Sequence, residues 1–298
     1  RRAREIVSTS LCITCACRVV RHLEERISSS SVDTPAKLFT SCCRITTEKN
    51  IAPRTMGKFA GRRALVTGAG SGIGRATALK LAEMGAEVFA LSKTLANLES
   101  LKQECPSINI IPVNLENWTE SREAVKKITP IHLLVNNAAY AEVAPFLEAS
   151  PECFDKTFNI NVKAILNISQ VVAGDLVARQ LRGTIVNVSS QAGHRALKDH
   201  TVYGSSKSAV EMLTKTMGIE LGPKGIRTNA VAPTVVKTPM ALVGWSDPVK
   251  AAGMISRIPQ GRFAEVEEVV NAIVFLLSDE SDMVNGHSLP VDGGFLAA

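Results

Sequence analysis

A tyrosine and a lysine four residues apart, Tyr203 and Lys207, are the first residues whose types and spacing suggest chemistry. On a helix the positions i and i+4 share a face, so a phenol and an ammonium group can act on the same small region. A neighbouring ammonium favours the phenolate and lowers the pKa of the phenol, which is about 10 in a free side chain. The pair is therefore a candidate for holding and transferring a proton. The same spacing also arises by chance on a helix surface, so it needs support from other motifs.

A glycine-rich segment, TGAGSGIG at residues 67–74, follows a short apolar run and opens an amphipathic stretch. Glycines allow a tight turn and let backbone N–H groups and a helix N-terminus approach an anion. In the first strand and helix of a parallel sheet, such a turn binds the pyrophosphate of a dinucleotide. The alternative is a tight turn without a ligand. The predicted contacts are Gly68, Ser71, Gly72, Ile73 and Gly74.

The end of the second apolar run indicates which dinucleotide is preferred. An acidic residue at this place would accept hydrogen bonds from the ribose of NAD. The sequence there is ALSKT, with Ser92, Lys93 and Thr94 and no acid. Hydroxyl groups and a cation suit the 2′-phosphate of NADP, although lysine offers a single charge where arginine offers a fork. We therefore predict NADP(H), the alternative being an ordinary exposed turn.

The elements that must position these residues are short apolar runs that alternate with longer amphipathic stretches. Runs without polar alternation suit strands that are covered on both faces, as in a mostly parallel sheet between helical layers. The longest helical candidates are 152–181 and 201–221. The pattern predicts an α/β fold, a single doubly wound Rossmann-type domain over residues 56–298. Its seven predicted strands are 63–68, 87–91, 108–113, 131–137, 183–190, 226–233 and 288–294.

Residues 1–55 differ in composition from the rest of the chain. They hold ten Lys and Arg against five Asp and Glu, which leaves 24 against 23 in residues 56–298. The body is therefore not basic, and we predict no nucleic-acid partner. We interpret the segment as a disordered extension, either an organelle leader or an upstream region that is not native. The expected location is cytoplasmic, or mitochondrial if the segment is a leader.

The cysteines and histidines give no sign of a metal site. Five of the seven cysteines lie in residues 1–55, and only Cys105 and Cys153 lie in the body. Two scattered thiols fit a reducing compartment. Cys12 and Cys15 have metal-ligand spacing, but no second Cys/His pair follows them. We predict no metal ion, and no apolar run reaches the length of a membrane span.

Four motifs of the sequence resemble those of the short-chain dehydrogenase/reductase family. They are the glycine spacing Gly-x-x-x-Gly-x-Gly, NNAA at 136–139, the IVNVSS run and the Tyr203/Lys207 pair. The resemblance covers the body from about residue 60 to the end. It implies that Tyr203 is the proton donor and that Lys207 lowers the pKa of Tyr203 and contacts the nicotinamide ribose. Ser190, thirteen residues before Tyr203, would bind the substrate carbonyl. Asn161, in FNINVKA, would complete a proton relay through water.

Further residues are assigned by the same resemblance. It implies cofactor contacts from Asn114, Leu115, Asn136, Ala138, Val236 and Thr238. Segments such as WSDP and RFAEVEEVVNAI resemble the xylulose and dicarbonyl type of carbonyl reductase within the family, and this implies a substrate pocket with Leu197, His200 and Trp245 and a homotetramer. The sequence also departs from the family pattern, with Asn114 in place of an aspartate, Ala139 in place of a glycine, and Ser71 where NADP-preferring relatives often have a base.

The resemblance implies an NADPH-dependent reductase of small ketoses or vicinal dicarbonyls. The alternatives in the same class are a 3-oxoacyl reductase and a steroid or retinol dehydrogenase. The alternative from another class is a nucleotide-binding scaffold without activity, because a fold alone does not establish catalysis. All four catalytic positions are filled, which favours an enzyme.

Overall fold

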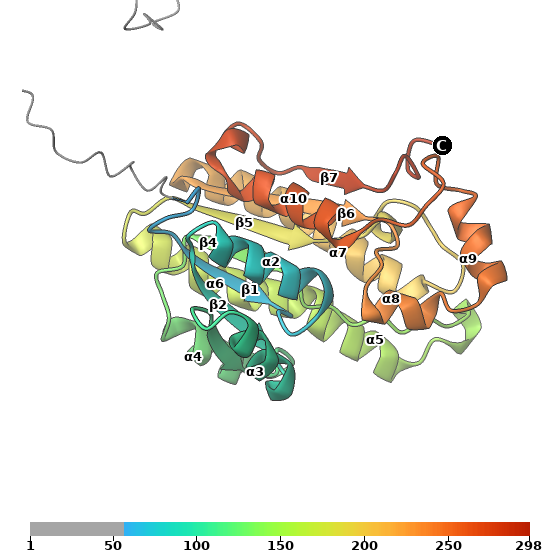
Figure 1. Cartoon of the computed structure of the whole chain (residues 1–298), viewed down its shortest axis with the longest axis horizontal. Coiled ribbons are helices and arrows are strands. Elements are labelled where there is room, and N and C mark those ends of the chain that lie inside the picture. The colour runs from blue at the N-terminus through green and yellow to red at the C-terminus, as the bar shows by residue number, and fades with distance from the viewer. Residues whose placement is uncertain (1–56) are drawn as a thin grey trace, which may run out of the picture. The chain divides into compact units, whose positions relative to one another are not determined.

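Seven parallel strands form one sheet in the order β3-β2-β1-β4-β5-β6-β7 (Figure 1). The computed structural model describes residues 57–298, so the predictions for residues 1–55 lie outside it. The seven runs predicted from the sequence are all strands, and the doubly wound fold class is confirmed. The strands are β1 (Arg63–Thr67), β2 (Glu87–Ser92), β3 (Asn109–Pro112), β4 (Leu133–Asn136), β5 (Gly183–Val188), β6 (Ile226–Pro233) and β7 (Ser288–Val291).

The strand order reverses between β1 and β4. From β1 the chain moves outward to β2 and β3, and then returns to β4 on the other side of β1. Val66 of β1 pairs with Val135 of β4, so the carboxyl ends of the two strands lie side by side. In open parallel sheets a crevice forms at such a switch point, because the connections leave in opposite directions. This crevice is where a ligand site is expected.

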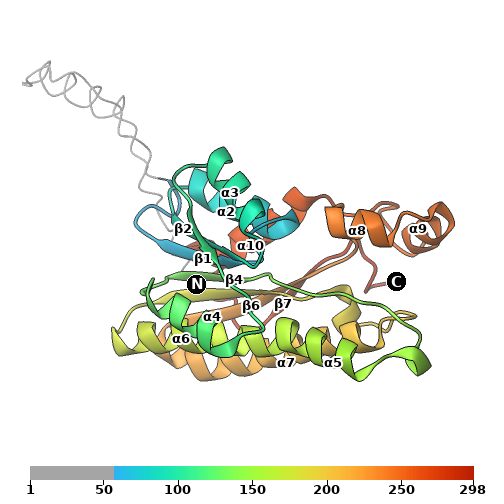
Figure 2. The same cartoon turned by 90° about the horizontal axis from the view of Figure 1, so that it is seen from below.

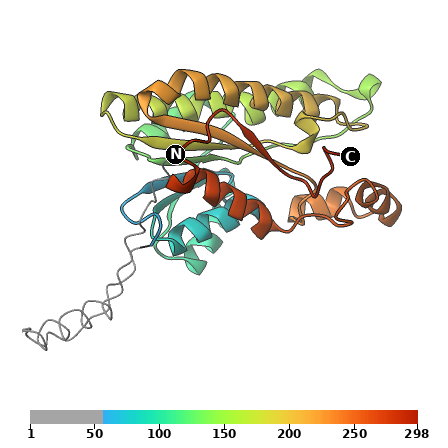
Figure 3. The same ribbon diagram turned by 90° about the horizontal axis from the view of Figure 1, so that it is seen from above.

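Helices cover both faces of the sheet (Figure 2). One layer contains α2 (Gly72–Glu83), α3 (Leu95–Glu104) and α10 (Val266–Leu277). The other layer contains α4 (Trp118–Lys126), α5 (Pro151–Phe158), α6 (Ala164–Ala178) and α7 (Thr201–Leu221). Two short helices, α8 (Pro239–Gly244) and α9 (Pro248–Ile255), lie beyond the carboxyl ends of β5 and β6, and the C-terminal end of the chain lies beside them (Figure 3).

The two layers explain why the strands read as continuous apolar runs. Successive strand side chains point to opposite faces. Leu65 packs in the core beneath α4, α6 and α7, whereas its neighbour Val66 packs in the core beneath α2, α3 and α10. Each such side chain stabilises the fold by about 1.5–3 kcal/mol through burial. Both positions must therefore be apolar, and no polar alternation remains.

The predicted helix at 152–181 contains an interruption. Between α5 and α6 the backbone forms a π-helical turn at Asn159–Lys163, and α6 ends at Ala178. Turns of this kind often occur at functional sites, since the wider turn changes the direction of the side chains. The apolar pattern contains no signal for it. The other long helix, α7, spans the predicted residues 201–221.

The sequence-based statement that no apolar run is long enough for a membrane span is corrected by the structure. The helical segment Pro151–Ala178 has 28 residues and, by length and composition alone, is long and apolar enough to cross a membrane. However, 61% of its most apolar 18-residue stretch is buried inside the fold. Its apolar side chains pack against the sheet, as in the core cluster that contains Ile168 and Leu176. Core packing therefore accounts for its composition.

Candidate active site

The glycine-rich turn brings the N-terminus of α2 to the crevice between β1 and β4. Gly68 has a φ of +65°, in the left-handed region that favours glycine, and a Cβ there would lie 2.7 Å from the Cα of Ala138. At Gly74 a Cβ would lie 2.4 Å from the carbonyl oxygen of Gly68. The turn is therefore tight because of packing, and it leaves the first N–H groups of α2 available to an anion.

A cavity of about 490 Å³ lies at this end of the sheet. Most of the residues predicted to bind the cofactor line this cavity. Of that set, Gly74 and Asn136 are not in the lining. The predicted residues that do line the cavity are Gly68, Ser71, Gly72, Ile73, Ser92, Lys93, Thr94, Asn114, Leu115, Ala138, Tyr203, Lys207, Val236 and Thr238.

Asn136, which the sequence analysis assigned to the cofactor site, does not line the cavity. It is buried, and its Nδ2 donates to Ser169 Oγ at 3.0 Å and to Asn187 Oδ1 at 2.8 Å, so it belongs to a polar network inside the sheet. The next residue, Asn137, lines the cavity instead. Its Nδ2 donates to the carbonyl oxygens of Thr67 at 3.1 Å and Gly68 at 3.2 Å, and this holds the glycine turn. Gly74 likewise supports the turn without facing the cavity.

The end of β2 carries the residues predicted to select the cofactor. Ser92 is half-buried and Lys93 is exposed, and both line the cavity. Within residues 57–298 no carboxylate forms an ion pair with Lys93, so its charge is available to an anion there. Asn97, which the sequence analysis missed, lines the cavity beside them. The donor set of hydroxyl, ammonium and amide groups fits a phosphate ester.

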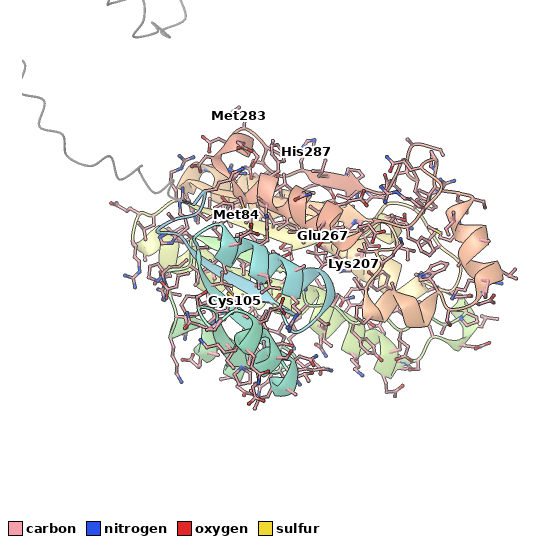
Figure 4. The ribbon with its side chains drawn as sticks, in the orientation of Figure 1. Met84, Cys105, Lys207, Glu267, Met283 and His287 are labelled. Atoms are coloured by element: carbon pink, nitrogen blue, oxygen red, sulfur yellow. The ribbon has the colours of Figure 1, made fainter. Side chains whose placement is uncertain are left out.

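Tyr203 and Lys207 lie one turn apart on α7, and both line the cavity. Lys207 is 1% exposed, and its Nζ donates to the carbonyl oxygen of Val188 at 2.8 Å. The Nζ lies 5.7 Å from the centroid of the Tyr203 ring. Figure 4 shows Lys207 within the fold, whereas Met283 lies at its periphery. The helix therefore places a buried ammonium group behind a half-buried phenol.

Burial determines the protonation of this pair. It lowers the pKa of Lys207 to about 8, while the carboxylate of Glu211 acts in the opposite direction. Burial also raises the pKa of Tyr203, and a hydrogen bond with Ser190 lowers it by less. Burial is therefore the larger of these two influences on Tyr203, and the net direction of its pKa is upward. The phenol is neutral at physiological pH, which is the state that a proton donor requires.

The structure distinguishes Ser190 from its neighbour Ser189. Ser189 is buried, and its Oγ donates to the carbonyl oxygen of Lys207 at 3.5 Å. Ser190 follows β5 with an extended backbone, accepts from the N–H of Ala192 at 3.1 Å, and contacts the Tyr203 phenol. Ser190 can therefore present a hydroxyl beside Tyr203, as the thirteen-residue spacing predicts.

Asn161 occupies the π-helical turn, and its side chain is fully buried. Its Oδ1 accepts from the backbone N–H of Tyr140 at 2.8 Å, and its Nδ2 donates to the Tyr140 carbonyl oxygen at 3.0 Å. The Nδ2 also donates to Ser206 Oγ at 3.0 Å. Asn161 does not line the cavity. Its side chain thus anchors the loop after β4 to α7, and the predicted water relay has no support from these contacts.

The predicted substrate residues Leu197, His200 and Trp245 all line the same cavity. The His200 and Tyr203 rings lie edge to face with their centroids 6.2 Å apart. Gln191, which the sequence analysis missed, is 2% exposed and lines the cavity, and its Oε1 has no hydrogen-bond partner within the described residues. The sequence feature that could have identified Gln191 as a cavity residue is its position directly after Ser190.

The two body cysteines are free thiols, Cys105 half-buried and Cys153 buried. Among residues 57–298, no group of three or more His, Cys, Asp or Glu side chains is placed to hold a metal ion. The Cys12 and Cys15 pair lies outside the described residues.

Comparison with known proteins relates this geometry to characterised enzymes. A family model described as enoyl-(acyl carrier protein) reductase matches residues 68–296. L-xylulose reductase of Mus musculus is 56% identical over 239 residues, which cover 80% of this chain and 98% of that protein. D-erythrulose reductase of Gallus gallus is also 56% identical, over 240 residues and with the same coverage.

A solved structure shows the same fold. The gluconate 5-dehydrogenase of Burkholderia cenocepacia, in complex with NADP and tartrate, superimposes with a TM-score of 0.77 at 31% sequence identity. The match covers 82% of this chain and 99% of that one.

Proposed function

Because the chain belongs to the short-chain dehydrogenase/reductase family, we propose that it is an NADPH-dependent reductase of small ketoses and vicinal dicarbonyls, with Tyr203 as the proton donor. The observation that carries this proposal is the common cavity. Its lining includes the glycine turn and Lys93 together with Ser190, Tyr203 and Lys207. A dinucleotide and a carbonyl group can therefore meet at the phenol.

The residues around the cavity fit NADP(H). The N–H groups at the start of α2 would hold the pyrophosphate, while Ser92, Lys93 and Thr94 would hold the 2′-phosphate. Lys207 would contact the nicotinamide ribose, as the family resemblance implies. When bound, the reduced cofactor supplies the hydride. The NADP in the gluconate 5-dehydrogenase structure supports this choice of cofactor.

Reduction of a carbonyl also requires a proton on oxygen. The neutral phenol of Tyr203 donates this proton as the carbonyl carbon receives the hydride, and the phenol becomes a phenolate. Ser190, which already contacts the phenol, donates a hydrogen bond to the carbonyl oxygen and orients it. The ammonium group of Lys207 stabilises the phenolate through its positive charge, and this effect is strengthened because Lys207 is shielded from water. Solvent then returns a proton to the phenolate.

The substrate half of the cavity suits a short molecule with hydroxyl groups. Ser190 and His200 contribute polar atoms to its lining. Trp245 and Leu197 contribute apolar surface. The names of the two curated relatives, reductases of L-xylulose and D-erythrulose, agree with this polarity.

The test is the loss of NADPH absorbance with L-xylulose, D-erythrulose and diacetyl, with a steroid ketone and a 3-oxoacyl thioester in parallel. We expect turnover of the first three compounds at higher kcat/KM than of the other two. A preference for the thioester would replace the proposed substrate class and keep the family. Failure of all five, in a protein that binds NADPH, would favour a nucleotide-binding scaffold.

We also propose that the chain assembles into a homotetramer. On α7, Met212 is 61% exposed and Ile219 is 77% exposed. These large apolar side chains lie on the side of α7 away from the sheet, and symmetric association of copies would bury them. Sedimentation velocity tests the assembly. A monomer at micromolar concentration would exclude it.

A further inference from the structure

The last segment of the chain, residues 292–298, packs closely against the residues that follow α9. Asp292 accepts from the N–H of Gly294 at 2.9 Å and of Leu296 at 2.8 Å, so its carboxylate closes a turn. Gly293 and Gly294 both have positive φ angles, and a Cβ on Gly293 would lie 2.7 Å from Ile258 Cγ2. The N–H of Gln260 donates to the Gly293 carbonyl oxygen at 3.1 Å. Close packing and hydrogen bonds therefore fix this segment in place.

Phe295 lies at the centre of this contact. Its side chain is 0% exposed, and the guanidinium carbons of Arg195 and Arg257 lie 5.1 Å and 4.9 Å from its ring centroid. Arg195 also donates to the carbonyl oxygens of Phe295 at 3.0 Å and Ala298 at 2.7 Å. Arg195 comes from the loop after β5, while Arg257 comes from the residues after α9. One aromatic ring therefore joins two separate parts of the fold.

The loop after β5 lines the cavity, and so do Trp245 and Lys250 from the segment that precedes Arg257. Phe295 belongs to a small apolar cluster with Met254 of α9, which also contains Leu197 and Trp245. Leu197 lies two residues after Arg195 and shares its loop with His200, whereas Trp245 lies between α8 and α9. Figures 1 and 3 both show the C-terminal end beside these two helices. None of these contacts involves the glycine turn or Tyr203.

We propose that residues 292–298 act as a brace that sets the distance between the Leu197/His200 wall and the Trp245 wall, and that this distance determines which carbonyl compounds fit. The segment does not touch the reacting atoms, so Phe295 and Arg195 are positioning residues. A narrow spacing matches a short ketose, while a wider spacing admits bulkier ketones and holds the ketose loosely. This inference rests on the proposed function for the identity of the substrate.

The kinetic test uses Phe295→Ala, which removes the ring, and Arg195→Ala, which removes an exposed side chain that bonds to the segment. Loss of positioning by about 1 Å lowers rates by up to about a hundred-fold, so we expect kcat/KM for L-xylulose to fall by about ten- to a hundred-fold. Most of the loss should appear in KM, and diacetyl, which has no hydroxyl groups to orient, should be affected less. NADPH affinity should stay unchanged. Phe295→Leu, which keeps most of the volume, should restore most of the activity.

Arg179→Ala is the matched control, because Arg179 pairs with Asp175 on α6 and does not line the cavity. An equal loss with L-xylulose and diacetyl, or a parallel loss of NADPH affinity, would overturn the proposal, since either result indicates general damage to the fold. Unchanged KM values in both Phe295→Ala and Arg195→Ala would also overturn it.

A second measurement does not depend on activity. In a Trp118→Phe background, Trp245 is the remaining tryptophan, and its fluorescence reports on the wall that carries it. We expect acrylamide to quench this fluorescence more strongly in Phe295→Ala and Arg195→Ala than in Phe295→Leu or Arg179→Ala. Equal quenching in all four would show that the segment does not position Trp245. This result stands even if the protein reduces none of the proposed carbonyl compounds, so the two proposals fail separately.

Discussion

Glu211 lies one helical turn after Lys207 on α7, and its buried carboxylate opposes the effect of burial on the pKa of the lysine. The Oε1 of Glu211 accepts from Ser288 Oγ at 3.0 Å and lies 3.0 Å from His194 Nε2, while its Oε2 has no partner within the described residues. The negative charge of Glu211 therefore helps the ammonium form of Lys207 to persist inside the protein.

The first prediction concerns the pH dependence of turnover. The pKa of Lys207 is lowered to about 8, so its ammonium form dominates below that pH and is lost as the pH rises through it. We expect kcat/KM to fall above pH 8. Glu211→Gln removes the charge that raises this pKa, so the decline should begin at a lower pH. Glu220→Gln, an exposed position on the same helix, is the control and should leave the profile unchanged. Identical profiles for Glu211→Gln and wild type would remove Glu211 from the mechanism.

The second prediction concerns Tyr203→Phe. The ring and its packing remain, and only the hydroxyl that donates the proton is lost. We expect kcat to fall by about two to four orders of magnitude, the usual contribution of a positioned general acid, with unchanged NADPH affinity. Rapid-mixing kinetics and NADPH fluorescence measure the two quantities. Near-normal turnover would mean that another group supplies the proton.

The third prediction concerns Ser92 and Lys93. A charge-assisted hydrogen bond from Lys93 to the 2′-phosphate should give NADPH an advantage of roughly ten- to a hundred-fold over NADH in kcat/KM. Ser92→Asp with Lys93→Ala should reverse the preference, because the new carboxylate accepts from a free ribose hydroxyl and repels a phosphate. Lys80→Ala, where the lysine pairs with Glu83 on α2, is the control. A double variant that still prefers NADPH would show that the phosphate is held elsewhere.

The fourth prediction concerns the residues before Met56. Among the described residues, the cavity lining begins at Gly68 and the first strand, β1, begins at Arg63. A protein that starts at Met56 should therefore keep its melting temperature, NADPH affinity and turnover. A lower melting temperature or lost turnover in the shortened protein would show that residues 1–55 contribute to the folded enzyme.

The strands could be predicted from the sequence for a physical reason. A strand covered on both faces must be apolar throughout, so each run is visible. The helical spacing only suggests the Tyr203/Lys207 pair, and the proposed roles of Tyr203, Lys207 and Ser190 come from the family resemblance. Local patterns of this kind fix the ends of parallel strands, where the site must lie.

The features that could not be predicted depend on orientation or on distant contacts. Adjacent strand residues point to opposite faces, so a one-residue ambiguity between Asn136 and Asn137 reverses which one reaches the cavity. The spacing of apolar residues in the sequence does not indicate the π-helical turn. Nothing in the sequence around Phe295 indicates its role, because that role depends on contacts with Arg195, which is 100 residues away in the sequence.

The hydrogen bonds from the Asn161 side chain to the backbone of Tyr140 have a consequence for the engineering of this enzyme. One amide group holds the loop after β4 by the N–H and carbonyl of Tyr140, and holds α7 through Ser206. Because the loop is held by its backbone, the side chains of Tyr140, Ala141 and Val143, all in the cavity lining, can be exchanged without loosening this contact. A library confined to these three positions would vary the cavity lining and leave Tyr203 in place. Asn161 itself should be kept constant in such a library, since an aspartate would face the Tyr140 carbonyl with a second acceptor.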